Sequence, residues 1–485
     1  MMNAQNKKIW AWSMYDWANS AFSTTVMAGF FPIFFEKYWS NPDDVIQSTY
    51  QLGMANALAS IIIAAVAPFL GAIADRGSAK KKFLIFFCYL GVVMTSGLFI
   101  VGQGEWQLAL MLFVAATVGF MGANIFYDSL LLSVSPTEKV DYVSSFGFAL
   151  GYIGGGLLFL INVIMFLKPE IFGFIDGDVA TLARSIREDE IAYADVQAVV
   201  AGLSSKYAEL KTAFISMSTS EVDLLKKITE FLSSAEATAI KLSFFSVAVW
   251  WGLFTIPLMI FVPEPESDDS TTLGRAVLEG YQQMKTTFKH IRELKVIGIF
   301  LIAYWLYIDG VDTIIRMSVK IGSSLGFETG DLITALLMVQ FIAFPAALAY
   351  NWFASKIGTK KAVLIAIGGY SVITLLAFFM THKTHFFMLA ALIGLFQGGI
   401  QALSRSLYAR LVPKGKEAEF FGFYNMLGKF AAVIGPVLIG WVTLATGNVR
   451  LGILSIIILF ISGGYLLNKV DFEKGEELAK QFSHK

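Results

Sequence analysis

The chain has 485 residues, of which 56% are hydrophobic and 15% are charged, and its formal net charge is zero. Soluble domains carry about 25% charged residues, so the composition excludes an ordinary soluble domain and indicates an integral membrane protein. A balanced charge gives no reason to expect a nucleic-acid partner. The single cysteine, Cys88, lies in an apolar run and leaves no disulfide or cysteine-based metal site.

Long apolar runs follow one another along the chain. An uncharged run of about 18 residues or more is able to cross the ~30 Å of hydrocarbon in a bilayer. Eleven such runs occur, at residues 17–35, 45–74, 83–104, 106–127, 142–167, 242–263, 332–355, 362–381, 386–404, 430–449 and 451–468. A twelfth, 296–319, is apolar up to Ile308 and then carries charges. We therefore expect an all-α membrane protein with twelve transmembrane helices.

The orientation follows from lysine and arginine in the short loops, because positive residues stay on the cytoplasmic side. With a cytoplasmic N-terminus, thirteen of these residues fall in inside connections and four in outside ones. Both termini are therefore expected in the cytoplasm. The N-terminal segment lacks a small-residue cleavage site, so we expect the first span to be retained. The short tails favour a bacterial inner membrane over an organelle.

Segments of the first half recur in the second half. GAIADRGSAKKK from Gly71 corresponds to NWFASKIGTKK from Asn351, each after an even-numbered span. NIFYDSLLLSVSP from Asn124 corresponds to QALSRSLYARLVP from Gln401, and SSFGF from Ser144 corresponds to EFFGF from Glu419. Such repeats indicate duplicated structural units. We expect two pseudo-symmetric bundles of six helices each.

The repeat sets the domain boundaries. The N-terminal bundle takes residues 1–167 and the sixth span 242–263, and the C-terminal bundle takes 296–470. A cytoplasmic linker, 264–295, joins them, and a cytoplasmic tail follows at 471–485. Residues 168–241 have no counterpart in the second half and form an insertion on the outside face.

The insertion is polar but has apolar residues at helical spacing. SEVDLLKKITEFL places Val222, Leu225 and Ile228 on one face of a helix. Ser218 and Glu221 have the spacing of a capping box. We expect two to four amphipathic helices that form either a small cap on the outer rim or a module that binds an unknown partner or captures substrate.

One loop motif and four longer segments resemble a known family. The loop G-x-x-x-D-R with a following basic cluster, which resembles the major facilitator superfamily of transporters, consists of Gly71, Asp75, Arg76, Lys80 and Lys81. YDWANSAFSTTV from Tyr15, GFALGYIGGG from Gly147, QALSRSLYARLVP and EFFGFYNMLGKFAAVIGP resemble the vacuole-effluxer family, which is related to the autophagy-linked amino-acid exporters of fungal vacuoles. The resemblance implies the major facilitator fold, with rocking-type alternating access and substrate near the midplane.

Two groups of residues receive structural roles from this resemblance and from spacing. We expect the loop after the second span to act as a conformational latch, in which Asp75 and Arg76 cap helix ends and bridge the bundles. Gly147, Gly151 and Gly155 recur every four residues, a spacing that lets transmembrane helices approach closely. We therefore assign them to helix packing.

Polar residues inside the spans are the candidates for transport. A charge at the centre of a span costs at least about 2.5–3.5 kcal/mol on insertion scales, so such residues usually face a cavity and are paired. The candidates for substrate or ion coupling are Asp16, Asn19, Asn124, Asp128, Asp309, Asp312, Arg316, Gln401, Arg405 and Lys429. Asp309, Asp312 and Arg316 share one helical stripe, and we expect Asp312 to pair with Arg316.

The charge balance of these candidates suggests a coupling mechanism. The candidates comprise four aspartates but only two arginines and one lysine. One carboxylate is therefore expected to lack a partner and to be able to take up a proton. This favours proton-coupled transport in which Asp16 or Asp128 carries the proton and Arg405 attracts an anionic or carboxylate-bearing substrate. Sodium is a rival ion for the same carboxylates. The other interpretation is that these charges form structural salt bridges between the bundles.

We predict a secondary transporter of a small polar or zwitterionic solute, with exported amino acids as candidates. A lipid-like substrate is an alternative that the 43 phenylalanines support weakly, and a non-transporting sensor is a third. The expected partners are the solute, a proton or sodium, and membrane lipid. No enzyme motif occurs, no cofactor is expected, and the histidines His382 and His385 lack a third ligand for a metal.

Overall fold

The computed structural model is helical in every regular element of the part that it describes, with no strand among those residues. It describes residues 3–42, 44–188, 191, 193–203, 207–208, 211–212, 220–265, 295–324, 327, 329–430 and 434–482. The predicted linker, 264–295, therefore lies almost wholly outside the described residues.

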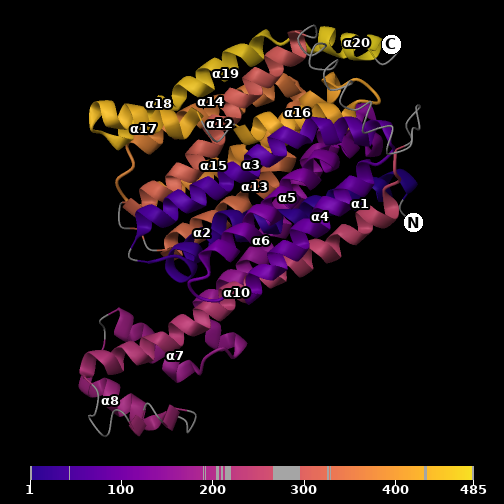
Figure 1. Cartoon of the computed structure of the whole chain (residues 1–485). Coiled ribbons are helices and arrows are strands. Elements are labelled where there is room, and N and C mark those ends of the chain that lie inside the picture. The colour runs from indigo at the N-terminus through magenta and orange to yellow at the C-terminus, as the bar shows by residue number, and fades with distance from the viewer. Residues whose placement is uncertain are drawn as a thin grey trace.

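The N-terminal bundle contains six predicted spans, and each of them is helical (Figure 1). The first is a chain of short elements that includes π-helical turns: α1 (Ala4–Ala21), η1 (Phe22–Phe30), α2 (Phe31–Phe34) and η2 (Phe35–Trp39). The others are α3 (Val45–Arg76), α4 (Lys80–Gly97), α5 (Trp106–Val134), α6 (Val140–Leu167) and α10 (Glu221–Phe261).

The C-terminal bundle repeats this order. Its helices are α12 (Lys295–Ser324), α13 (Thr329–Ile357), α14 (Thr359–Phe378), α15 (Lys383–Leu411), α16 (Glu417–Phe430), α17 (Ile434–Thr446), α18 (Val449–Ser455) and α19 (Ile457–Lys469), followed by α20 (Phe472–Phe482). Of the described helices, ten are long and apolar enough to cross a membrane. The first predicted span is helical but divided into short elements, and the eleventh is helical in most of its described residues, so the twelve predicted segments are consistent with this structure.

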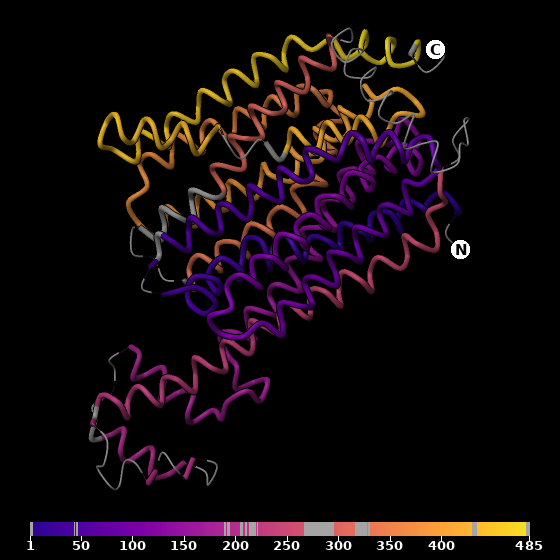
Figure 2. Tube along the Cα trace, in the orientation of Figure 1, coloured from indigo at the N-terminus to yellow at the C-terminus, as the bar shows by residue number. Residues whose placement is uncertain are grey.

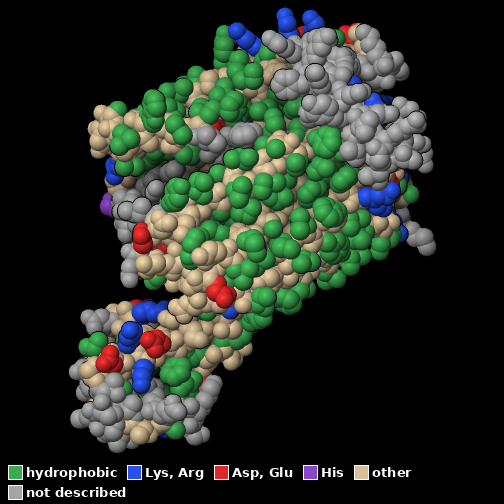
Figure 3. All heavy atoms as spheres, viewed as in Figure 1, with side chains coloured by type: hydrophobic (Ala, Val, Ile, Leu, Met, Phe, Trp, Pro, Cys, Tyr) green, Lys and Arg blue, Asp and Glu red, His purple; other side chains and the backbone are tan. Residues whose placement is uncertain are grey.

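The helices run side by side through one apolar body (Figures 1 and 2). Both labelled termini lie at one end of this body, and the insertion projects from the opposite end. The visible flank of the body is covered by hydrophobic side chains (Figure 3), and large apolar residues such as Trp441 and Leu444 are exposed. A protein with an apolar belt around parallel spans is a multi-pass membrane protein.

The predicted glycine stripe lies between α6 and α1. A Cβ atom on Gly147 would meet Asp16 Oδ2 at 2.7 Å, and one on Gly151 would meet Ser20 Oγ at 2.6 Å. A Cβ atom on Gly155 would meet the Ser20 carbonyl oxygen at 3.0 Å. The missing side chains thus allow α6 to lie directly against α1.

The insertion has a small hydrophobic core of its own. The core joins α7 (Gly177–Arg187), α8 (Tyr193–Gly202) and the first half of α10, through residues such as Val179, Val200 and Ile228. Arg184 binds Glu170 at 2.6 Å, and Arg187 binds Glu236 at 2.8 Å. The insertion is therefore a folded helical unit.

Helix α10 adds two details to the predicted insertion. The N-cap of α10 is Ser220, whose Oγ accepts from Asp223 N at 3.2 Å, whereas the predicted cap, Ser218, lies outside the described residues. The insertion also does not end where the sixth span begins, because α10 runs without interruption from Glu221 to Phe261. One helix therefore serves both the insertion and the membrane body.

Candidate functional site

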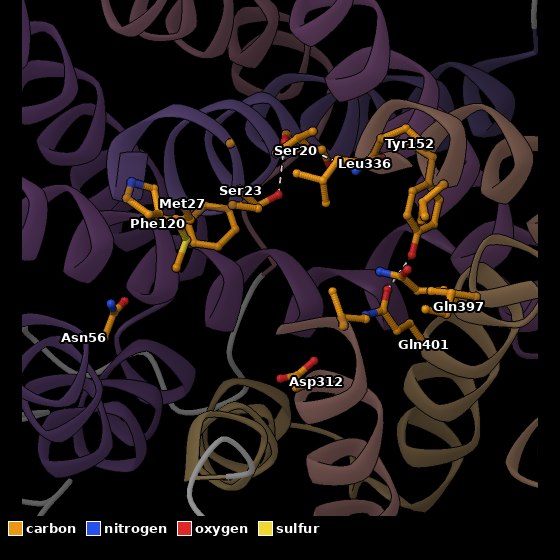
Figure 4. Close-up of a pocket in the computed structure, with 18 of the residues that line it drawn as sticks. Ser20, Ser23, Met27, Asn56, Phe120, Tyr152, Asp312, Leu336, Gln397 and Gln401 are labelled. Atoms are coloured by element: carbon orange, nitrogen blue, oxygen red, sulfur yellow. Dashed lines mark hydrogen bonds between the residues drawn. The ribbon is translucent and has the colours of Figure 1, made fainter. Parts of the chain in front are cut away.

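A large cavity lies between the two bundles (Figure 4). Its volume is about 1120 Å³, and both bundles contribute four spans to its walls. Lys37 and Thr49 line it at the end away from the termini and are exposed, so the cavity is open there. Asp16, Asp128 and Arg405 line its inner end.

A cluster of buried charges closes this inner end. Arg405, on α15 of the C-terminal bundle, places Nη1 3.1 Å from Asp128 Oδ1 and Nη2 3.5 Å from Asp16 Oδ2. Its Nε donates to Ser144 Oγ at 2.9 Å, and Nη2 also donates to the Ser144 carbonyl at 3.0 Å. All three partners belong to the N-terminal bundle, so this single guanidinium connects the two halves of the protein.

Asp128 and Arg405, which the sequence predicts to be repeat-equivalent, are direct partners. They stand 277 residues apart on α5 and α15. Equivalent residues of a two-fold repeat meet only near the symmetry axis. The pseudo-two-fold axis therefore passes close to this ion pair, at the floor of the cavity.

The two aspartates of the cluster have different surroundings. Asp128 Oδ2 accepts from Asn425 Nδ2 at 2.9 Å, in addition to its bond with Arg405. Asp16 Oδ2 accepts from Tyr127 OH at 2.7 Å, but among the described residues its Oδ1 makes no hydrogen bond. Asp16 is consequently the less firmly held of the two carboxylates, and it borders the cavity.

Aromatic rings fix the position of the guanidinium. The Cζ atom of Arg405 lies 4.2 Å from the ring centre of Phe148, 5.1 Å from that of Trp12 and 5.5 Å from that of Tyr127. Cations within about 6 Å of a ring face are attracted by its quadrupole. The rings thus stabilise a buried cation that also has two anionic partners.

Amides and hydroxyls form much of the remaining wall. Asn19 Nδ2 donates to Asn124 Oδ1 at 2.6 Å within the N-terminal bundle. Tyr152 OH donates to Gln401 Oε1 at 2.6 Å across the bundles. Asp312 projects from α12 into the same space (Figure 4). The cavity therefore offers hydrogen-bond donors and acceptors on all sides.

Asp309 does not belong to this wall, which corrects the predicted stripe. It is fully buried, and its two carboxylate oxygens accept from Ile434 N and Gly435 N, both at 2.9 Å. Thr313 Oγ1 also donates to it at 3.1 Å. These amides belong to the first two described residues of α17, so Asp309 binds the backbone of this helix instead of facing the cavity. Of the two stripe residues whose side chains the structure describes, Asp312, one helical turn later, is the one that reaches the cavity.

The cavity is closed at the terminal end by a second group of contacts between bundles. Asp75, at the end of α3, accepts from Ala418 N at 3.0 Å and from Glu419 N at 2.8 Å. Lys80 Nζ lies 2.8 Å from Asp75 Oδ1 and 2.6 Å from Glu417 Oε2. A side chain on Gly71 would run into the Ala418 carbonyl. Here α3 and the start of α4 hold the first turn of α16.

A further set of contacts joins the two bundles at the same terminal end of the cavity. Arg410 Nη2, at the end of α15, donates to Asp141 Oδ2 at 2.8 Å, and Thr359 Oγ1 donates to the same oxygen at 2.7 Å. We call these contacts, together with those of Asp75, Lys80 and Glu417, the inner gate. In this conformation the inner gate is closed and the opposite end is open.

Lys81 is a predicted part of the latch, but among the described residues its side-chain hydrogen bonds stay within its own bundle. Its Nζ donates to the carbonyls of Met259 at 3.2 Å and Val262 at 2.9 Å, at the end of α10. Lys360 makes the equivalent contact in the other half, with the carbonyls of Asn468 and Val470, both at 2.8 Å. Each lysine thus satisfies the free carbonyls at the end of a sixth span.

The family model described as "Vacuole effluxer Atg22 like" matches residues 45–133 and 200–480. The "Uncharacterized MFS-type transporter YxiO" of Bacillus subtilis is 35% identical over 482 residues, which cover 99% of each chain. "Autophagy-related protein 22" of Kluyveromyces lactis is 24% identical over 69% of each chain. The chain belongs to the vacuole effluxer Atg22-like family of major facilitator transporters.

Solved structures support the fold of this family member. The proton:xylose symporter XylE matches with a TM-score of 0.60 at 12% identity and covers 98% of both chains. The human organic anion transporter MFSD10 also matches with a TM-score of 0.60 at 12% identity, over 96% of this chain and 100% of its own. This Atg22-like protein is accordingly a secondary transporter with the major facilitator fold.

In this Atg22-like transporter, the cavity brings together seven of the ten predicted candidates: Asp16, Asn19, Asn124, Asp128, Asp312, Gln401 and Arg405. The side chains of Arg316 and Lys429, on α12 and α16, lie outside the described residues, and so does the expected pair of Asp312 with Arg316. Arg76 is the last residue of α3.

Tyr127, Ser144 and Asn425 complete the ion cluster and were missed. Tyr127 directly precedes Asp128, and Ser144 opens the repeated SSFGF segment, so both stood beside residues that the sequence singled out.

Proposed function

We propose that this protein is a proton-coupled secondary transporter that exports a small polar or zwitterionic solute, with amino acids as the first candidates. The cluster of Asp16, Asp128 and Arg405 carries the proposal. It places two carboxylates and one cation at the floor of an open cavity and joins the two bundles. With the termini in the cytoplasm, as the loop charges indicate, the open end faces outside.

Proton binding at Asp16 is the coupling step of this proposal. Asp16 has an oxygen on the cavity side, and its contact with Arg405, at 3.5 Å, is the longer of the two ion pairs. A proton that arrives through the open cavity would neutralise Asp16 and weaken its attraction for Arg405. The tie between the bundles would then loosen, and the inner gate could open toward the cytoplasm.

The cavity wall supports a polar solute over a lipid. Asn19, Asn124, Gln401 and Asp312 are able to exchange hydrogen bonds with hydroxyl, amine or carboxylate groups. The predicted role of Arg405 as an attractor of substrate carboxylates receives no support in this conformation, because its Nε and both Nη atoms already have protein partners. We therefore assign Arg405 to coupling.

The decisive experiment compares two charge-neutralising variants in proteoliposomes with an imposed pH gradient. Asp16→Asn should still bind and exchange solute but should no longer respond to the gradient. Asp312→Asn is the matched control, since it removes the same charge from the facing wall; it should change the solute concentration needed for half-maximal transport and keep the pH response. An unchanged gradient dependence in Asp16→Asn would contradict the assignment.

The coupling ion is tested in the same vesicles. If protons are the coupling ion, replacement of sodium by choline should leave uptake unchanged, and collapse of the pH gradient should abolish concentrative uptake. Loss of transport in choline at a constant pH gradient would instead identify sodium as the ion.

A further inference from the structure

Each cation of the inner gate has two carboxylate partners, one in its own bundle and one across the interface. Lys80 lies 2.8 Å from Asp75 in its own bundle and 2.6 Å from Glu417 in the other. Arg410 lies 2.8 Å from Asp141 in the other bundle, and its Nη1 lies 4.0 Å from Glu476 Oε1 on α20 of its own side. The second distance is too long for a hydrogen bond.

Helix α20 is attached to the C-terminal bundle. Gly475 lies against the side chains of Leu411 and Val296, so that α20 approaches both α15 and α12 closely. The Phe472 ring packs against the Phe300 ring at 5.8 Å. Glu476 follows Gly475 directly, and Leu411 follows Arg410, so the same packing sets the distance between the two charged groups. When the bundles separate, α20 therefore moves together with Arg410.

The guanidinium of Arg410 has unused hydrogen-bonding capacity in the closed gate. Its Nε is buried and makes no hydrogen bond among the described residues, and Asp141 Oδ1 is likewise buried without a partner. A partly exposed cation that loses its only close anion incurs a modest electrostatic penalty. Opening of the gate would separate Arg410 from Asp141 and create this penalty.

We propose that Glu476 is a reserve counter-ion for Arg410 that replaces Asp141 when the inner gate opens. A movement of the Arg410 guanidinium by about 1 Å toward α20 brings it within hydrogen-bonding distance of Glu476. The exchange keeps the cation paired in both conformations, so Glu476 stabilises the open gate and Asp141 the closed gate. Glu476 is a positioning residue, because it lies outside the cavity and acts through Arg410.

This inference rests on the alternating access of the proposed function, and it is tested without any substrate. Ala418 is fully buried where the first turn of α16 meets α3, so a cysteine at this position becomes accessible when the gate opens. Cys88, the only native cysteine, is buried and is replaced by serine in the background. The readout is the rate at which a maleimide labels Ala418→Cys in the full-length protein, with the total thiol counted after unfolding.

Glu476→Gln should slow this labelling about threefold, the effect of losing one partly exposed ion pair, whereas Asp141→Asn should accelerate it. Glu477→Gln is the matched control, since Glu477 is an exposed neighbour on α20, and it should leave the rate unchanged. In an Arg410→Gln background, Glu476→Gln should have no further effect.

Two outcomes overturn the proposal: equal labelling of Glu476→Gln and Glu477→Gln, or a Glu476→Gln effect that persists without Arg410. If Asp141→Asn also leaves the labelling unchanged, the gate does not open in this way and alternating access itself is contradicted. The failure of the counter-ion and the failure of the proposed function therefore give different results.

Discussion

Replacement of Asp309 by asparagine tests whether this buried charge holds a helix or takes part in transport. Its carboxylate accepts two backbone amides of α17 at 2.9 Å and one hydroxyl at 3.1 Å. Asparagine has nearly the same shape but only one acceptor oxygen. Its amide group would place a donor against the N–H of Ile434 or Gly435, which would lose the carboxylate oxygen that accepts from it.

The magnitude follows from the bonds that are lost. A buried donor without a partner costs about 1–3 kcal/mol, and a hydrogen bond to a charged group contributes about 1.5–3 kcal/mol. Removal of the buried charge offsets part of this loss, and we expect a net destabilisation of about 2 kcal/mol. In a bundle of this size such a change lowers the unfolding temperature by about 4–8 °C.

The assay is thermal unfolding of the purified protein in detergent, followed by exposure of buried tryptophans or by aggregation. Asp312→Asn serves as the control, because Asp312 borders the cavity one turn away on the same helix, and it should shift the unfolding temperature by less than about 2 °C. If Asp309→Asn were as stable as the control but transport by this variant no longer responded to pH, Asp309 would be a coupling residue. The structural role of Asp309 in binding the α17 amides would then be refuted.

Three further predictions concern the gate, the cluster and the insertion. Gly71→Val should accelerate labelling of Ala418→Cys about tenfold, because the branched side chain would collide with the Ala418 carbonyl in the closed gate; an unchanged rate would mean that α3 and α16 adapt. Arg405→Lys should lower solute exchange at least about tenfold, since an ammonium cannot bridge two aspartates and Ser144 as the fork does; wild-type exchange in proteoliposomes would contradict this. Arg184→Gln should increase hydrogen exchange in the insertion at neutral pH. Arg184 lowers the pKa of Glu170 through its hydrogen bond, so the stabilisation is present above the ordinary value of 4.5 and is lost as the pH falls through the lowered value; the difference from wild type should vanish well below pH 4.5.

Most predictions about the fold and the cavity depend on the internal repeat in the sequence. The repeat predicts the two bundles, and it identifies Asp128 and Arg405 as equivalent residues. Charged residues inside apolar spans then identified most of the cavity, because the cost of burying a charge restricts it to such positions. The uncharged partners Tyr127, Ser144 and Asn425 carry no such signal, because a hydroxyl or an amide inside a span is common.

The sequence does not predict which side chains bind backbone amides or carbonyls. Asp309 binds the amides of Ile434 and Gly435, and Lys81 binds the carbonyls at the end of α10. Every residue has such groups, so no sequence pattern distinguishes the ones that a given side chain will meet. The sequence therefore assigns Asp309 to the cavity and Lys81 to the latch, whereas both side chains bind backbone groups of a helix, α17 and α10 respectively.

The continuity of α10 makes the insertion a mechanical extension of the membrane body. The part of this helix beyond the predicted span, 221–241, is about 30 Å long at 1.5 Å per residue. A rigid rod of this length that tilts by about 10° with its bundle displaces its far end by about 5 Å. If the N-terminal bundle rocks as proposed, the far end of the insertion would move sideways beyond the membrane, where a fluorophore pair or an attached binding protein could report or arrest the motion.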